Sequence, residues 1–218
     1  AFTYNKDSKF PKGEAALNQF FRQMTPDTGM DNAAGEQAID TDVVAKAVAA
    51  AIDEIYDRTG KKSILVTHSM GGTIGWRTPF RTDKVKAIIA FEPGGSPFIF
   101  PEGEVPEPVP TLYDPVKAQA MGVPLESFLA LTKLPMVLFY GDHISDGTTD
   151  EIGPDKWRSE FMMAKEFVSC VNRHGGMAEI VHLPDLGIKG NTHFLMADKN
   201  NEVIAGLMAD WLSAKGLS

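Results

Sequence analysis

The residues best suited to chemistry gather around Ser69, in the stretch THSMGG at residues 67–72. An apolar run precedes this serine and a glycine-containing segment follows it, which predicts a strand, a sharp turn and a helix. Such a turn, a nucleophile elbow, lifts the hydroxyl clear of the sheet and needs small neighbours two positions away. Gly71 meets that need and Thr67 meets it imperfectly. The helix is expected to begin at Met70, whose backbone N–H would serve as an oxyanion donor.

A serine hydroxyl becomes a good nucleophile when an imidazole accepts its proton, and five histidines compete for that role. His68 adjoins the serine and is expected to point away from it. His182 falls inside a predicted strand, and His174 falls at a helix end, where capping explains it. His193 lies in the loop PDLGIKGNTHF just past the last predicted strand, where ligands gather in parallel α/β sheets. We therefore predict His193 as the base, with His143 second.

The third member of a triad is an acid that orients the imidazole, and two residues qualify. Glu92 ends one apolar run in AFEPGG, and Asp142 ends another in FYGDH. The residues alone leave both open, since an acid beside Gly or Pro is often a turn or cap residue.

These side chains need a sheet to position them, and the apolar runs predict one. Short buried strands are expected at residues 63–67, 85–91, 135–140 and 177–183. Helices are expected around residues 14–24, at 41–59 between a capping Asp40 and Gly60, around 157–171, and near the C-terminus around 203–211. Strands that alternate with helices predict an α/β fold with a mostly parallel sheet.

The whole chain, residues 1–218, is expected to form a single domain with one irregular excursion. Eight of its fourteen prolines fall within residues 93–124, where no periodic pattern survives. We expect residues 94–130 to form a Pro-rich cap or lid running over the surface.

Composition narrows the function classes. A formal net charge of -8 argues against nucleic acid or an anionic membrane surface as the main partner. The single cysteine, Cys170, lies in a predicted helix and is expected to be a buried packing residue. No apolar run approaches the roughly 18 residues of a membrane span.

From residue 63 onward, the order of serine, acid and histidine and the spacing of the strands resemble an α/β-hydrolase. The motifs THSMGG, FEPGG, FYGDHI and LGIKGNTHF resemble a group of bacterial esterases whose acid is a glutamate after the sixth strand. A weaker likeness extends to FPKGEAALNQFFRQM near the N-terminus. The resemblance implies Ser69 as nucleophile, Glu92 as acid and His193 as base, with Asp142 as a helping acid nearby. Because such esterases are exported, it also implies a periplasmic or secreted protein.

The chain departs from that family at its N-terminal side. Family members begin with further strands, and the loop after the third strand carries a second oxyanion donor in an HG-type motif; no such motif appears ahead of the predicted strand at residues 63–67. The strand at residues 63–67 would then expose an apolar edge. The sequence starts with Ala1 and not with Met, and we expect the N-terminal strands to lie on a separate or missing segment. Our hypothesis is a companion chain, cut from the same precursor within its cap, that covers this edge.

The resulting prediction is a serine hydrolase that cleaves carboxylic esters through an acyl-enzyme intermediate. All reacting groups are protein groups, so no metal and no organic cofactor is implied. The alternatives are a non-catalytic binding module of the same fold, and an acyltransferase or thioesterase that uses the same triad. Haloalkane dehalogenases and epoxide hydrolases would require a carboxylate where Ser69 stands.

Overall fold

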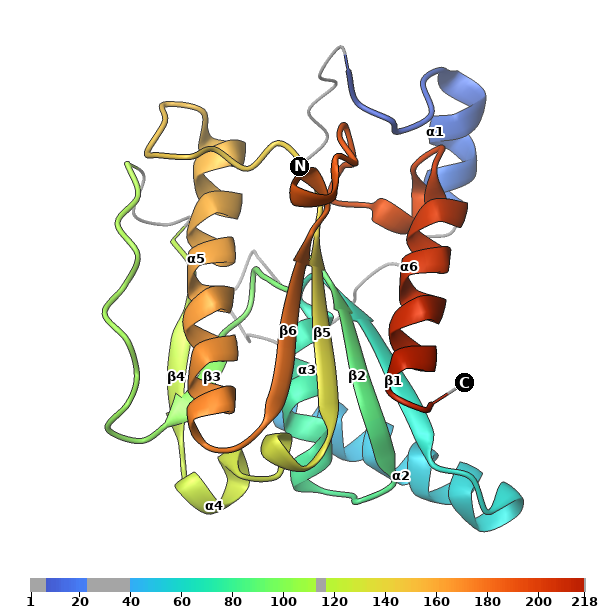
Figure 1. Cartoon of the computed structure of the whole chain (residues 1–218), viewed down its shortest axis with the longest axis vertical. Coiled ribbons are helices and arrows are strands. Elements are labelled where there is room, and N and C mark those ends of the chain that lie inside the picture. Colours follow the sequence, from blue (N-terminus) through green and yellow to red (C-terminus); the bar gives the residue numbers. More distant parts are fainter. Residues whose placement is uncertain (1–6, 23–39, 113–116, 218) are drawn as a thin grey trace, which may run out of the picture.

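The structure, a computed structural model, describes residues 7–22, 40–112 and 117–217 (Figure 1). Its strands are β1 (Ser63–His68), β2 (Val85–Phe91), β3 (Phe98–Pro101), β4 (Ala120–Val123), β5 (Pro135–Tyr140) and β6 (Met177–His182). Its helices are α1 (Glu14–Phe21), α2 (Thr41–Thr59), α3 (Gly71–Arg77), α4 (Leu125–Phe128), α5 (Ile152–Arg173) and α6 (Asn201–Ala214). Short 3-10 turns lie at Thr78–Phe80, Leu131–Lys133, Leu183–Leu186 and Leu195–Ala197. No helix in these described ranges is long and apolar enough to cross a membrane.

The main sheet has the order β1-β2-β5-β6, and each neighbouring pair is parallel. The four strands agree with the predicted runs to within one residue. Helix α2 also agrees, because the Asp40 side chain accepts the N–H groups of Asp42 and Val43 and Gly60 ends the helix at φ 66°. The predicted helix at residues 14–24 ends earlier, at Phe21, and its last two residues lie outside the described ranges.

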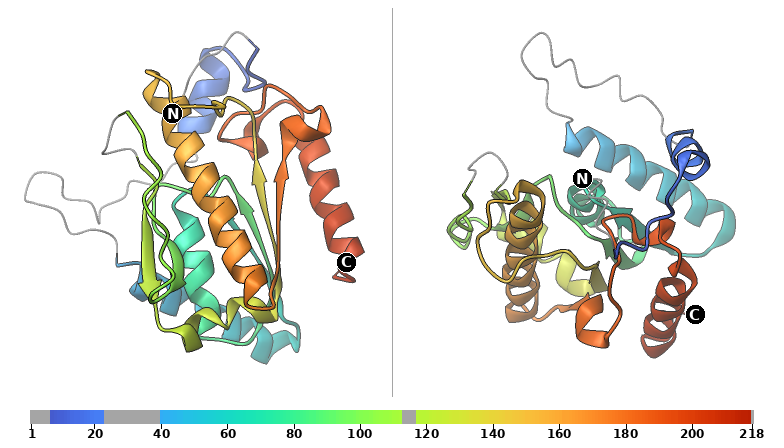
Figure 2. Two further views of the ribbon diagram at one scale, coloured as in Figure 1. Left: turned by 60° about the vertical axis from the view of Figure 1, so that its left-hand side comes forward. Right: turned by 90° about the horizontal axis from the view of Figure 1, so that it is seen from above.

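Helices cover both faces of this sheet (Figures 1 and 2). On one face, Ile88 and Met136 pack into a core with side chains of α2, α3 and α5. On the other face, Ile89 and Val137 pack against α6 through Trp211. The parallel sheet between helices confirms the predicted α/β fold with a mostly parallel sheet.

Burial differs between central and edge strands. Strands β2 and β5 are buried along nearly all their length, as predicted. The same prediction is wrong for β1, where Val66 is 53% exposed, and for much of β6. Within the described residues these two strands form the edges of the sheet, so each lacks a neighbour on one side.

Part of the Pro-rich segment at residues 94–130 is buried and does not run over the surface. Its strands β3 and β4 pair in parallel as a small second sheet. Phe98, Ile99 and Phe100 are buried in the main core, where Phe167 of α5 contacts both phenylalanine rings. The expectation of a wholly surface segment is wrong here. Prolines at positions 93, 97 and 101 interrupt the pattern around a short apolar strand, and its partner lies about 20 residues further on.

Candidate active site

Ser69 stands at the corner between β1 and α3. Its φ is 54°, the left-handed region that non-glycine residues rarely adopt. Helix α3 can begin this close to the sheet because Gly72 lacks a side chain: a Cβ there would lie 2.9 Å from Cβ of Pro93. A strand, a sharp turn at Ser69 and a helix thus follow one another in the order that the sequence predicts.

His193 lies within hydrogen-bonding distance of this serine. Its Nε2 is 3.0 Å from Ser69 Oγ, and its Nδ1 is 2.7 Å from Oε2 of Glu92. The other carboxylate oxygen of Glu92 accepts the N–H of Gly141 at 2.7 Å. The structure therefore brings together the serine, acid and histidine favoured by the sequence resemblance.

Glu92 and His193 are both withdrawn from water. Glu92 is 2% exposed, and burial raises the pKa of its carboxyl, while the Gly141 N–H opposes that rise by stabilising the carboxylate. Burial lowers the pKa of the His193 imidazole below its ordinary 6.5. A neutral imidazole at neutral pH can accept a proton from a serine hydroxyl.

Asp142 takes a different position from Glu92. Its two carboxylate oxygens accept the N–H groups of His143 and Gly190, each at 2.8 Å, and its own N–H donates to the carbonyl oxygen of Asn191. These contacts join the end of β5 to the loop that carries His193. His143, the second candidate base, occupies φ 64° in the turn after β5.

A second set of hydrogen bonds stabilises the His193 loop. The buried carboxylate of Asp198 accepts the N–H and hydroxyl of Thr192 and the side-chain amide of Asn191. Residues near the N-terminus contact the same loop, since the N–H of Lys9 donates to the carbonyl oxygen of Gly190 at 2.8 Å. Hydrogen bonds thus fix the loop both before and after His193.

Aromatic rings surround the imidazole of His193. Trp157, near the start of α5, has its ring centroid 4.1 Å away, and His68 has its centroid 4.4 Å away. His68 also contacts the carbonyl oxygen of His193 through Nε2 at 2.7 Å. The sequence predicts neither contact. Trp157 fits a helical core pattern, and only the fold brings the start of α5 over the loop after β6.

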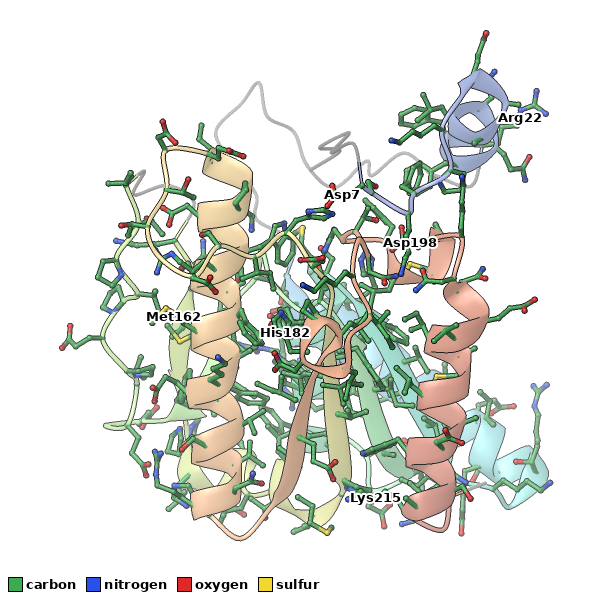
Figure 3. The ribbon with its side chains drawn as sticks, turned by 45° about the horizontal axis from the view of Figure 1, so that its top comes forward. Asp7, Arg22, Met162, His182, Asp198 and Lys215 are labelled. Carbon is green, nitrogen blue, oxygen red and sulfur yellow. The ribbon has the colours of Figure 1, made fainter. Side chains whose placement is uncertain are left out.

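A cavity of about 490 Å³ opens onto these groups. Its lining includes Ser69, Glu92 and His143, which are the only non-glycine residues with positive φ in the described part of the chain. Strained backbone of this kind concentrates at functional sites. Figure 3 shows the top of the molecule, where the carboxyl ends of the strands meet the loops. An open surface depression of about 560 Å³ beside residues 79–84 is lined by no serine, cysteine or histidine.

Met70 and Lys156 also line the site cavity. Met70 is the N-cap residue of α3, and its side chain is 45% exposed. Lys156 Nζ pairs with Oε1 of the buried Glu160 at 3.0 Å, and that same oxygen accepts the N–H of Gly95. The sequence pattern does not predict a role for this lysine. The feature that could have pointed to it is its position in the first turns of a helix that follows a strand.

Comparisons with known proteins agree with this architecture. A protein of Fungal sp. (strain ATCC 74256) named "Probable secreted lipase phiG" is 27% identical over 177 residues, which cover 72% of this chain and 47% of that protein. A solved structure of a novel bacterial esterase matches 100% of this chain and 54% of its own, with a TM-score of 0.69 and 22% identity. The chain thus spans about half the length of the relatives it matches.

The esterase domain of a Rhodothermus marinus protein matches 81% of this chain and 80% of its own, at 12% identity and a TM-score of 0.42. No protein-family model matches the chain. The parallel sheet between helices and the match to the bacterial esterase structure show that the chain has the fold of an α/β-hydrolase.

Proposed function

We propose that the protein is a serine hydrolase of carboxylic esters, with Ser69 as nucleophile, His193 as general base and Glu92 as the orienting acid. The observation that carries the proposal is the continuous contact from Ser69 Oγ to His193 Nε2 at 3.0 Å and from His193 Nδ1 to Glu92 at 2.7 Å. Similarity to a secreted lipase and to a bacterial esterase supports an ester substrate.

The reaction follows from the positions of these groups. His193 Nε2 accepts the hydroxyl proton as Ser69 Oγ attacks the ester carbonyl carbon, and the carbonyl oxygen becomes an oxyanion. The imidazolium then gives that proton to the leaving alcohol, which departs and leaves an acyl group on the serine. Water repeats the sequence, releasing the carboxylic acid and restoring Ser69. Throughout, the Glu92 carboxylate accepts a hydrogen bond from the Nδ1–H of His193 and stabilises the imidazolium.

The oxyanion needs N–H donors at the start of α3. The proposed donor is the N–H of Met70, at the position that α/β-hydrolases use for this purpose. The partial positive charge at the N-terminus of a helix supports the same charge. In this proposal the second donor comes from a companion segment.

The proposed companion is an N-terminal chain from the same precursor that pairs with the outer edge of β1. The half-exposed Val66 on that strand supports it. Intact mass and native mass of purified protein test it. A second polypeptide bound in equal amount is the expected result, whereas full turnover by this chain alone would contradict it. The expected periplasmic or secreted location of the protein also stays a prediction.

A fluorophosphonate probe tests the nucleophile directly, because it reacts with activated serines. We expect stoichiometric labelling of the assembled protein at Ser69, no labelling of Ser69→Ala, and a loss of ester turnover on the order of 10⁴-fold or more in that variant. Ser96→Ala is a matched control near the site, because its hydroxyl contacts Met70 and Thr73 but no histidine in the described structure. An unlabelled but correctly folded assembly would instead favour a binding module.

A further inference from the structure

Three side chains with metal-binding atoms converge at the C-terminal end of α5, far from the catalytic groups. Nε2 of His174 lies 2.9 Å from Oε1 of Glu104, and Sγ of Cys170 lies 3.8 Å from its Oε2. The ligand atoms of all three residues lie within 4.8 Å of one another. The proposed esterase mechanism uses none of these groups.

The fold explains why the three meet. Cys170 and His174 are four residues apart, so they lie on the same face at the last turn of α5. Glu104 reaches them from the chain that follows β3, after a turn in which Gly103 has φ 86° and the Glu104 N–H donates to Pro101. A ring contact with Phe128, at 5.5 Å between centroids, orients the imidazole of His174.

The ligand types single out zinc among common cations. Thiolate, imidazole and carboxylate are its usual protein ligands, whereas magnesium and calcium prefer oxygen alone. Bond lengths of about 2.0–2.3 Å in a tetrahedron place neighbouring ligand atoms about 3.3–3.8 Å apart. The separations of 2.9 and 3.8 Å involve different oxygens of Glu104, and all three ligand atoms lie within 4.8 Å of one another, so a tetrahedral site requires side-chain shifts of about 1 Å.

Solvent access also fits a metal site. Cys170 is fully buried, while the side chains of Glu104 and His174 are 39% and 22% exposed. An ion can thus enter from the side of the carboxylate, where a water molecule can complete the coordination. Arg173, at 3.5 Å from Glu104, has a side chain that is 55% exposed and can swing into solvent when a cation arrives.

We propose that Glu104, Cys170 and His174 bind a zinc ion, with water as the fourth ligand, and that this ion fastens the connection between β3 and β4 to the end of α5. On binding, the thiol of Cys170 releases its proton to solvent and the sulfur forms a bond to the metal.

The proposed role of the zinc ion is structural, because the ion would lie far from the active site. Trp157 and His174 are 17 positions apart on and just past α5, which at about 1.5 Å per residue separates the ion from the active site by roughly 25 Å. Higher on the helix, polar side chains already hold the same connection: Asp155 accepts the N–H of Leu112, and Ser159 accepts that of Ala118. The zinc ion would add an attachment at the C-terminal end of the same helix, which Figure 1 labels α5.

Cobalt(II) titration of the metal-free purified protein tests the proposal without any ester substrate. Because Cys170 is the sole cysteine of the chain, a thiolate-to-cobalt charge-transfer absorption reports that residue alone. We expect one cobalt per chain, this absorption band, its loss on addition of zinc, and a higher melting temperature with either metal. Glu104→Gln and His174→Gln should bind at least about 10-fold more weakly, and Cys170→Ser should lose the band.

His182→Gln is the matched control, since His182 also pairs with an acid, Asp185, at 3.1 Å but has no thiol nearby in the described structure. It should bind cobalt like the wild type. Binding without the thiolate band, unchanged affinity in His174→Gln, or no binding at equimolar metal and protein would each overturn the proposal and leave a hydrogen-bonded ion pair. The two glutamine variants decide the question even if Cys170→Ser fails to fold. Since no step involves Ser69, a negative result here leaves the proposed esterase function untouched.

Discussion

Replacing Glu92 by glutamine separates the two candidate acids and tests the proposed triad. The glutamate receives two donors, the Gly141 N–H and the Nδ1–H of His193, each at 2.7 Å. These donors face different carboxylate oxygens, and glutamine has an oxygen at only one of the two positions. If it keeps Gly141, its NH₂ group faces Nδ1 and drives the imidazole proton to Nε2. That tautomer cannot take the proton of Ser69.

The opposite orientation of the glutamine is worse. It would place the NH₂ group against the buried Gly141 N–H, and two facing donors without an acceptor cost about 1–3 kcal/mol. We therefore expect Glu92→Gln to adopt the unproductive orientation and to lose on the order of 10⁴-fold in kcat, as removal of the orienting acid does in the best-studied triad. That loss equals about 5 kcal/mol of transition-state stabilisation.

Asp142→Asn is the matched comparison, because this residue also ends a strand beside the site. Its oxygens accept the N–H groups of His143 and Gly190 and none from His193, so we expect less than a ~10-fold loss from this partly exposed position. The assay is hydrolysis of an activated ester, with melting curves to confirm folding. Severe loss in Asp142→Asn together with more than a tenth of wild-type turnover in Glu92→Gln would refute the assignment.

Three further predictions follow from burial and close packing. The pKa of His193 is lowered, so protonation of the imidazole, which removes the base, begins below the ordinary value of 6.5. We expect kcat/KM to stay constant as the pH falls through 6.5 and to decline only at lower pH. An acid limb centred above pH 6.5 would contradict this. Gly141→Ala should lower kcat with little loss of fold, since a Cβ would lie 2.9 Å from Glu92 Oε1 and 3.0 Å from the carbonyl oxygen of Asn191; wild-type kcat would show that the acid tolerates displacement. Phe167→Ala should destabilise the protein by about 3–5 kcal/mol in urea unfolding, because this fully buried ring contacts Trp76 and Phe98; a change below about 1 kcal/mol would mean that the Pro-rich segment does not share the core.

Local sequence determined most of the main scaffold. The apolar runs at β2 and β5 are continuous because both faces of these strands are covered, and their bounds follow from that pattern alone. Asp40 and Gly60 bound α2 through local hydrogen bonding and a left-handed cap, which need no tertiary partner. The turn around Ser69 was predictable for the same reason, since its strand, small residues and helix are contiguous.

Tertiary structure decided what depends on residues far apart in the chain. Both acids follow parallel strands whose carboxyl ends meet at one edge of the sheet, so the residues alone could not choose between them, although the family resemblance favoured Glu92. The fold places Glu92 beside His193, 101 positions later, and ties Asp142 to Gly190 instead. Pairing of β3 with β4, exposure of β1, the Trp157 contact and the Glu104 cluster share that origin: each depends on which distant segments become neighbours, which local periodicity does not encode.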